Sequence, residues 1–228
     1  MQTGMEIKEI LCYGDSNTWG TIPRWEESEL PSERYDENTR WTKVAQKLLG
    51  EEYHLIEEGL GGRTTIYGSG ADSWKTGNGF LRVCLETHRQ LDLVILMLGT
   101  NDLSRPEPPK EEVLGDGITE LVKIVQENPK CGKNYETPKI LVVSPIEIKP
   151  SAPNGRIKVY PMFHGDYGKM LSQKFPEVYE QVAKEYGCYF LNAALYAEPS
   201  NGDGVHFTPE SHLRLGKAMA KKIQEIFA

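Results

Sequence analysis

Two continuous apolar runs, within Leu91–Leu98 and Lys139–Ser144, restrict the fold more than any other segment. A strand that is apolar at successive positions has both faces covered, which is typical of a parallel sheet between helices. Three more segments have strand character: Ile7–Tyr13, Tyr53–Glu57 and Cys188–Asn192. Because helical patterns alternate with these segments, we predict an α/β fold, a three-layer α/β/α sandwich with a five-stranded parallel sheet.

The helical patterns have recognisable ends. Three helices are predicted at Thr39–Leu49, Lys110–Gln126 and Asp166–Tyr186. Gly187 is a favourable C-terminal cap for the third, and a final helix is predicted to open at Thr208 with Pro209 in its first turn. Its buried stripe would be Leu215, Met219, Ile223 and Ile226. The 228 residues suffice for one substantial domain, so we expect residues 1–228 to form a single one.

Charge and cysteine content exclude several classes of protein. The formal net charge is −7, whereas a nucleic-acid-binding protein favours a basic surface. The longest apolar run, Leu93–Leu98, is far shorter than the roughly 18 residues of a membrane-spanning helix. Met1–Glu9 lacks the apolar core of a signal peptide, and the scattered cysteines show no Cys-x-x-Cys spacing. We therefore expect a reduced, cytoplasmic protein without nucleic-acid or membrane partners.

Residues suited to chemistry follow three of the predicted strands. Ser16 comes just after the first strand, Gly62 after the second and Asn101 after the third. In doubly wound α/β proteins, sites gather at the carboxyl ends of the strands. The three residues are therefore expected at one edge of the sheet.

The segment Gly14–Gly20 places a serine where the first strand breaks into a turn. Asp15 or Ser16 could simply cap a helix there, and for this segment alone that structural explanation is favoured. The functional explanation is that Ser16 attacks a substrate while its backbone N–H points toward a developing negative charge. A serine hydroxyl is a poor nucleophile without a base, so this explanation requires a base elsewhere in the chain.

Two further segments supply candidate donors to a negatively charged oxygen. Gly61 and Gly62 either form a plain turn or leave space for a substrate oxygen to approach the Gly62 N–H. Asn101 either completes a turn through its own side chain or donates its amide to an oxyanion. Asp102 is expected to bond the loop backbone. Taken singly, each segment leaves both explanations open.

The candidate base is His206, because Asp203 lies three residues before it and glycines flank the aspartate. A tight bend there can bring the carboxylate to Nδ1 of the imidazole and leave Nε2 for Ser16. A metal site made of Asp203, His206 and His212 is the alternative. No fourth ligand is in view for it, so we favour the base.

Taken in order along the chain, these segments resemble the SGNH hydrolases, also called the GDSL esterase/lipase family. The similarity is closest to a subgroup of arylesterases and acyltransferases, and it covers nearly the whole chain. It is carried by Gly14–Gly20, Arg40-Trp41-Thr42, Ile56–Leu60, Arg63-Thr64-Thr65, Leu91–Asp102, Val142–Pro145 and Asp203–Thr208. The resemblance implies the SGNH, flavodoxin-like version of the sandwich.

The resemblance also implies roles for individual residues. Ser16 would be the nucleophile, His206 the general base and Asp203 the residue that orients the base. The oxyanion donors would be the backbone N–H groups of Ser16 and Gly62 and the side chain of Asn101. The implied reaction is hydrolysis of short-chain or aryl carboxylic esters through an acyl-enzyme, with acyl transfer to alcohols or peroxide as a further outcome. It requires a small-molecule ester and no metal or organic cofactor.

Substrate contacts are expected from residues beside the nucleophile. Asn17, which stands where related acyltransferases can carry an apolar residue, and Trp19 are the candidates. Two long loops, Thr21–Asn38 and Pro145–Gly165, are expected on the same side of the sheet. Their aromatic residues, Trp25, Tyr160 and Phe163, suit either sugar stacking or an apolar acyl or aryl group.

Two other functions are compatible with these observations. The first is a carbohydrate O-acetylesterase on the same scaffold, for which the two loops would decide the substrate. The second, more remote, is a non-catalytic binding module, which the loss of a site residue would have suggested. The resemblance further implies a homo-oligomer, in which the loop at 21–38 could pack on a neighbouring subunit.

Overall fold

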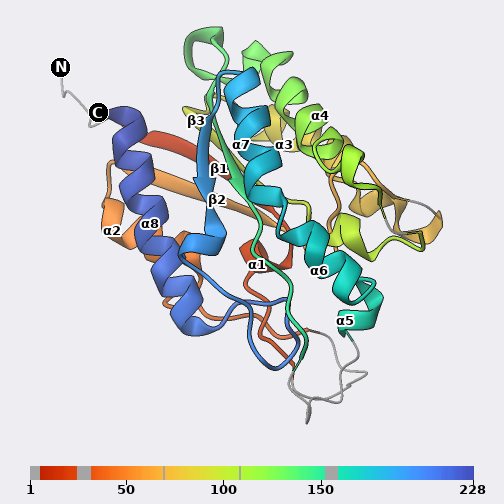
Figure 1. Cartoon of the computed structure of the whole chain (residues 1–228). Coiled ribbons are helices and arrows are strands. Elements are labelled where there is room, and N and C mark those ends of the chain that lie inside the picture. The colour runs from red at the N-terminus through yellow and green to blue at the C-terminus, as the bar shows by residue number, and fades with distance from the viewer. Residues whose placement is uncertain (1–5, 25–31, 69, 108, 152–158) are drawn as a thin grey trace, which may run out of the picture.

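Five parallel strands form the centre of the molecule (Figure 1). The structure is a computed structural model that describes residues 6–24, 32–68, 70–107, 109–151 and 159–228. The strands are β1 (Lys8–Gly14), β2 (Tyr53–Gly59), β3 (Leu93–Met97), β4 (Lys139–Ser144) and β5 (Tyr189–Asn192). Their order is β2-β1-β3-β4-β5, and each neighbouring pair is parallel. The predicted α/β fold and its five strands are confirmed, with small shifts at the strand ends.

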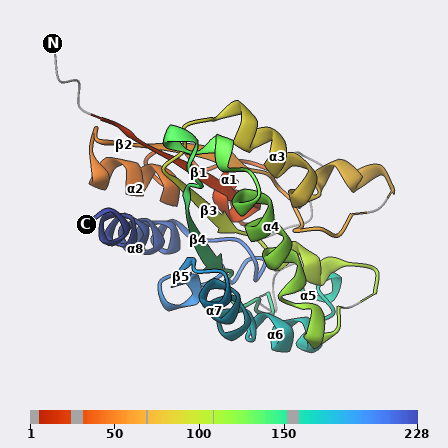
Figure 2. The same ribbon diagram turned by 90° about the horizontal axis from the view of Figure 1, so that it is seen from above.

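Helices cover both faces of this sheet. The α-helices are α1 (Ser16–Trp19), α2 (Trp41–Leu49), α3 (Gly77–Thr87), α4 (Asp116–Gln126), α5 (Val159–Met162), α6 (Asp166–Ser172), α7 (Phe175–Glu185) and α8 (Pro209–Phe227). The short 3₁₀ turns are η1 (Gly70–Lys75), η2 (Thr100–Ser104), η3 (Glu111–Val113), η4 (Pro129–Cys131), η5 (Lys133–Tyr135) and η6 (Ala193–Leu195). Figure 2 shows α2 and α8 on one side of the sheet and α3, α4 and α7 on the other.

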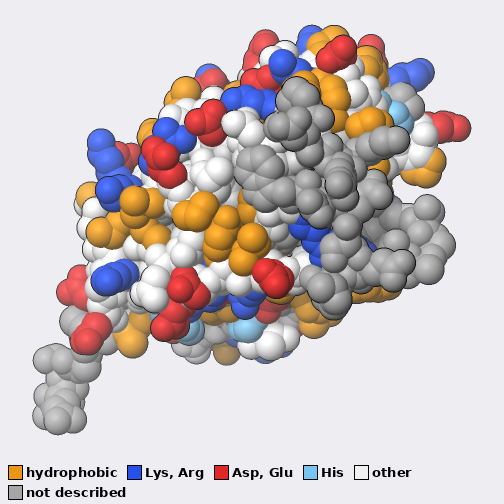
Figure 3. Space-filling model, turned by 90° about the horizontal axis from the view of Figure 1, so that it is seen from below, with side chains coloured by type: hydrophobic (Ala, Val, Ile, Leu, Met, Phe, Trp, Pro, Cys, Tyr) orange, Lys and Arg blue, Asp and Glu red, His pale blue; other side chains and the backbone are white. Residues whose placement is uncertain are grey.

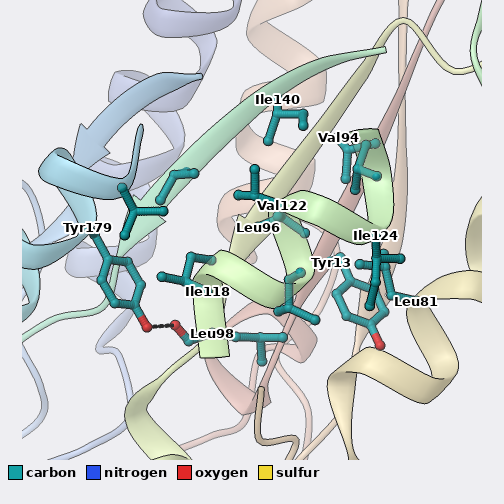
Figure 4. Close-up of a cluster of buried hydrophobic side chains, with 14 of the residues drawn as sticks. Tyr13, Leu81, Val94, Leu96, Leu98, Ile118, Val122, Ile124, Ile140 and Tyr179 are labelled. Atoms are coloured by element: carbon teal, nitrogen blue, oxygen red, sulfur yellow. Dashed lines mark hydrogen bonds between the residues drawn. The ribbon is translucent and has the colours of Figure 1, made fainter. Parts of the chain in front are cut away.

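The alternation of side chains along β3 explains why two separate cores form. Val94 and Leu96 point to the face covered by α3, α4 and α7, whereas Ile95 and Met97 point to the face covered by α2 and α8. Figure 4 shows the first core, with the Tyr179 hydroxyl hydrogen-bonded to the backbone at the end of β3. Both faces of the central strand are therefore buried, as its continuous apolar sequence predicts.

The last predicted helix is confirmed, and two others are shorter than predicted. α8 begins after Thr208, whose side chain accepts a hydrogen bond from the N–H of Ser211. The pattern at Asp166–Tyr186, however, is two helices, α6 and α7. Pro176 lies in the first turn of α7, and a proline ring clashes with the carbonyl four residues earlier, so one continuous helix cannot form. Similarly, α4 begins only after Gly115, and the residues before it form η3.

The carboxyl ends of three neighbouring strands meet at one edge of the sheet. Gly14 at the end of β1 pairs with Gly59 of β2 and with Met97 of β3. α1 follows β1 directly and η2 follows β3, so Ser16 and Asn101 are placed at this edge. Figure 3 shows the molecule from below, with hydrophobic, acidic and basic side chains interspersed on the described surface. In the described part of the chain, no helix is long and apolar enough to cross a membrane.

Candidate active site

Ser16, His206 and Asp203 form a hydrogen-bonded series at this edge. His206 Nε2 lies 3.0 Å from the Oγ of Ser16, and its Nδ1 lies 2.7 Å from an oxygen of Asp203. Asp203 is 2% exposed and Ser16 7%, whereas His206 is half-buried. This geometry allows the imidazole to accept the serine proton while the carboxylate binds the opposite ring nitrogen.

The bend before His206 is built by the aspartate itself. One oxygen of Asp203 accepts the backbone N–H groups of Val205 and His206, at 3.0 and 2.9 Å, and its other oxygen binds the imidazole. Gly204 has a φ of +76°, and a Cβ atom there would lie 1.8 Å from the carbonyl oxygen of Lys149. Only glycine fits this position, so the tight turn predicted from the sequence is present.

The environment of Asp203 keeps its carboxylate charged. Burial alone would raise its pKa, but the hydrogen bond and charge of His206 and two backbone N–H groups oppose this effect. The net result is a pKa below the ordinary value. A carboxylate that remains ionised beside the imidazole stabilises the imidazolium that forms when the serine loses its proton.

The short helix α1 presents the serine. Asp15 is its N-cap and accepts the N–H of Asn17 at 2.9 Å, which leaves Ser16 at the first helical position, where backbone N–H groups have no intrahelical partner. A Cβ atom at Gly59 would lie 2.1 Å from the backbone nitrogen of Trp19, so the end of β2 directly contacts α1. Burial raises the pKa of Asp15 to about 6, against the opposing effects of the Asn17 N–H and the His206 charge.

The other two candidate donors lie in the same cleft as the serine. Gly62 has a φ of +77°, and the space where its side chain would be opens toward the aliphatic stem and ammonium group of Lys75. The amide nitrogen of Asn101 donates to the carbonyl of Arg63 at 3.0 Å, and this bond fixes the direction of the side chain. Ser16, Gly62 and Asn101 all line the cleft.

Arg63 is a buried residue that links the strand ends, and the sequence reasoning did not assign it a role. Its guanidinium is bonded to the carbonyl of Gly14 at 2.9 Å and to the carbonyl of Glu58, and it stacks on the Tyr13 ring at 4.2 Å. The carbonyl of Arg63 in turn accepts the Asn101 amide. Arginines are seldom fully buried, so composition and periodicity gave no signal; only the family resemblance included this residue.

Asp102 has the structural role predicted for it. One carboxylate oxygen accepts the backbone N–H of Thr65 at 2.8 Å, and the other accepts the Thr65 hydroxyl at 2.7 Å. Burial raises the pKa of Asp102 to about 6, although the Thr65 hydrogen bonds oppose the shift. The residue thus ties the loop after β3 to the loop after β2.

The cleft above the serine has a volume of about 1360 Å³. Its described walls include Trp19 and residues of both long loops, among them Ser32 of the first and Phe163 of the second. The Tyr160 hydroxyl instead donates to Asp166 at 2.8 Å, and Trp25 lies outside the described residues. The two loops therefore reach the side of the sheet where the sequence predicted them.

Asn17, for which a substrate contact is expected, has its side chain bonded to the backbone. Its side chain is 4% exposed and binds backbone groups of Val205 and Phe207, at 3.2 and 3.0 Å. These two bonds use the amide nitrogen and the amide oxygen, and the residue does not line the cleft.

His212, which the alternative metal site requires, is bonded to a different part of the chain than the candidate base. Its Nδ1 accepts the backbone N–H of Trp41 at 3.2 Å, and its ring packs against those of Tyr35 and Phe207. Burial, with a smaller contribution from Arg40 and His206, lowers the pKa of His212 to about 3. Across the described residues, no three His, Cys, Asp or Glu side chains are grouped as a metal site would need.

Comparison with known proteins identifies the family of the chain. The model of the GDSL-like lipase/acylhydrolase family matches residues 12–214. The chain belongs to this family. It is similar to the native aryl esterase of M. smegmatis, with 36% identity and a TM-score of 0.87 over 96% of this chain and 99% of that one. It is equally similar in fold to Est24, a carbohydrate acetylesterase from Sinorhizobium meliloti, with 34% identity, a TM-score of 0.87 and the same coverage.

A lipase/acylhydrolase from Enterococcus faecalis shares only the fold, at 17% identity and a TM-score of 0.62 over 96% of each chain. Among curated proteins, none matches the chain. The family match and the solved structures make the chain an SGNH esterase, a carboxylic ester hydrolase.

Proposed function

We propose that this SGNH esterase acts through a covalent acyl-enzyme on Ser16. His206 Nε2 accepts the hydroxyl proton as Oγ attacks the ester carbonyl, and the tetrahedral intermediate then expels the alcohol, which takes that proton from His206. Water next attacks the acyl-enzyme and gives its proton to His206. The carboxylic acid leaves and Oγ recovers its proton, so the cycle consumes one ester and one water.

The observation that carries the proposal is the pair of distances around His206. A base must lie within about 2.6–3.2 Å of the atom whose proton it removes, and the 3.0 Å between Nε2 and the serine Oγ meets this requirement. The 2.7 Å bond to Asp203 fixes which ring nitrogen carries the proton.

The oxyanion would be held by the backbone N–H groups of Ser16 and Gly62 and by the Asn101 amide. All three face one cleft, and the Asn101 amide nitrogen carries a second hydrogen besides the one bound to Arg63. Neutral donors of this kind stabilise negative charge without a proton to lose, and they require no cofactor.

For the substrate, we infer short-chain or aryl esters, with Trp19 and Phe163 on the cleft walls favouring an apolar or aromatic group. Apolar walls also lower the cost of desolvating an organic acceptor, so transfer of the acyl group to alcohols or peroxide would compete with water. A carbohydrate O-acetylesterase is the second candidate, favoured by the similarity to the Sinorhizobium meliloti acetylesterase and by a cleft large enough for a sugar.

The mechanism is tested by Ser16→Ala, assayed with nitrophenyl acetate and longer nitrophenyl esters beside acetylated sugars. We expect nearly complete loss of turnover on every substrate with an unchanged circular dichroism spectrum. Near-normal turnover by the purified variant would exclude Ser16 as the nucleophile. The substrate with the highest kcat/KM in the unmodified protein decides between aryl ester and sugar acetate.

The transferase activity has its own test. A short acetate ester is supplied with a primary alcohol in water, and acetate and the new ester are both measured. A new ester whose yield rises with alcohol concentration supports transfer, and acetate alone at every concentration excludes it.

We further propose a cytoplasmic homo-oligomer that acts as one catalytic domain over residues 1–228. The four cysteines are free thiols, and Cys12, Cys84 and Cys131 are buried, which suits a reducing compartment. The loop at 21–38 borders the cleft, so a neighbouring subunit packed on it would narrow the entrance. Light scattering at micromolar concentration tests the assembly, and a monomer mass would exclude it.

A further inference from the structure

Asn17 makes the most informative contact near the site that the proposed mechanism does not use. Its amide nitrogen donates to the carbonyl of Val205 at 3.2 Å, and its amide oxygen accepts the N–H of Phe207 at 3.0 Å. These are the residues on either side of His206. A side chain on the nucleophile's helix therefore bonds the backbone immediately before and immediately after the proposed base.

This two-point pairing resembles a strand interaction. A neighbouring strand binds the carbonyl of one residue and the N–H of the residue two positions later, leaving the intervening residue to bond on its other side. His206 does so, because its N–H donates to Asp203 at 2.9 Å and its carbonyl accepts the N–H of Ser200 at 2.7 Å. The backbone around the imidazole is thus bonded on both sides, and Asn17 provides one whole side.

We propose that Asn17 is a positioning residue that sets the distance between the serine hydroxyl and the imidazole. Ser16 and Asn17 are consecutive residues of α1, so this short helix places the nucleophile and, through two hydrogen bonds, also the base. The inference rests on the proposed roles of Ser16 and His206. A displacement of about 1 Å between reacting groups can lower a rate by about 10²-fold, so loss of this pairing has a kinetic consequence.

The chain contains a matched control for this residue. Gln46, on α2, makes the same pairing with β2: its amide nitrogen donates to the carbonyl of Tyr53 at 2.6 Å, and its oxygen accepts the N–H of Leu55 at 2.7 Å. Tyr53 begins β2, so this pairing lies at the end of the strand opposite to the site. Removing the side-chain amide of Asn17 or of Gln46 takes a hydrogen-bond partner from two backbone groups. Only the backbone groups bonded to Asn17 flank His206.

The experiment compares Asn17→Leu, Gln46→Leu and Ser16→Ala in kcat, KM and melting temperature. For Asn17→Leu we expect kcat to fall by about 10- to 100-fold with KM changed less than about twofold, because the loss acts on the chemical step. Gln46→Leu should also lower the melting temperature, to a smaller degree because its pairing is only partly buried, and keep kcat. The rate at which a fluorophosphonate labels Ser16 should fall in parallel with kcat in the Asn17 variant alone.

The outcomes separate this inference from the mechanism on which it rests. Unchanged kcat in Asn17→Leu, or an equal loss of kcat in both leucine variants, overturns the positioning role. Full activity in Ser16→Ala overturns the mechanism instead. If circular dichroism shows that Asn17→Leu does not fold, Asn17→Ala replaces it, since the smaller side chain removes both hydrogen bonds without a steric clash.

Discussion

His206 and His212 are near neighbours in the sequence, but they differ in exposure and in hydrogen-bond partners. The His206 side chain is 22% exposed, with one ring nitrogen toward Asp203 and the other toward Ser16. His212 is fully buried at the start of α8, and its Nδ1 accepts a backbone N–H from Trp41. The first imidazole can exchange a proton with a group in the cleft, whereas the second has no path to solvent.

The difference between these surroundings shows what a histidine needs in order to act as a base. Burial disfavours the charge of a protonated His212, with smaller contributions from Arg40 and His206, so its pKa is lowered to about 3. The Nδ1 of this ring is already occupied as the acceptor of the Trp41 N–H. At His206, Asp203 accepts a hydrogen bond from Nδ1 of the ring and places a negative charge beside it. Accessibility and a carboxylate partner distinguish the two residues, and sequence spacing alone identifies only the partner.

The strongest test of this comparison replaces each histidine by glutamine and compares the effects on kcat and on melting temperature. His206→Gln should lower kcat by about 10⁶, the order expected when a base that acts as a unit with its nucleophile is removed, with little change in melting temperature. His212→Gln should do the reverse, keeping kcat within about tenfold and lowering the melting temperature, because a buried hydrogen bond is disturbed. Equal kinetic losses in both variants would show that the two surroundings are not functionally distinct.

The carboxylate partner is tested by Asp203→Asn. An amide keeps the shape but favours the wrong imidazole tautomer, so kcat should fall by about 10⁴ at neutral pH. Initial rates with nitrophenyl acetate, measured beside the circular dichroism spectrum, check this. A kcat close to that of the unmodified protein would mean that accessibility alone makes His206 a base.

The donors in the cleft provide a smaller effect. Asn101→Ala should lower kcat by about 10²–10³, the usual result of deleting one oxyanion donor, with KM little changed. Steady-state kinetics separate the two constants. If only KM moved, Asn101 would be a binding residue, and its bond to Arg63 would serve structure alone.

The smallest expected effect concerns the pH dependence of stability that His212 causes. The pKa of His212 falls to about 3 on folding, so between that value and about 6.5 the unfolded chain binds a proton that the folded one does not. Stability is therefore lost as the pH falls through this window, by about 1.4 kcal/mol per pH unit for one proton.

His212→Asn should remove this part of the pH dependence. The free energy of unfolding in urea, measured at pH 7.5, 6.5 and 5.5, gives the slope for both proteins. Asp15 and Asp102 contribute with the opposite sign, since burial raises the pKa of each to about 6, but they are present in both proteins and cancel in the difference. Parallel pH dependences would contradict a neutral, buried His212.

Local sequence signals predicted the parts of the fold that depend on neighbouring residues. The apolar run of β3 predicted a strand covered on both faces, and Thr208 with Pro209 predicted the start of α8. The break between α6 and α7 was missed, although Pro176 marks it, because the apolar periodicity continues across the break. The apolar periodicity predicted one helix, whereas the ring of this single proline excludes a continuous one.

The candidate site was predictable where spacing within one segment decides geometry, and not where distant segments meet. Asp203 and His206 lie within one turn, so their hydrogen bond follows from their spacing. No sequence signal pointed to the backbone partners of Asn17, because they lie near residue 206, at the other end of the chain. Only the folded structure brings these segments together. The same limitation hides the buried guanidinium of Arg63.

The cleft combines residues at strand ends with residues of long loops, and this arrangement has a consequence for the evolution of such an enzyme. Ser16 and Asn101 follow strand ends directly, whereas part of the wall comes from the loops at 21–38 and 145–165. Substitutions in those loops can alter which ester is accepted without disturbing the proposed catalytic groups. New specificities are therefore accessible to evolution, or to loop grafting between relatives, in small steps that each leave a working catalyst.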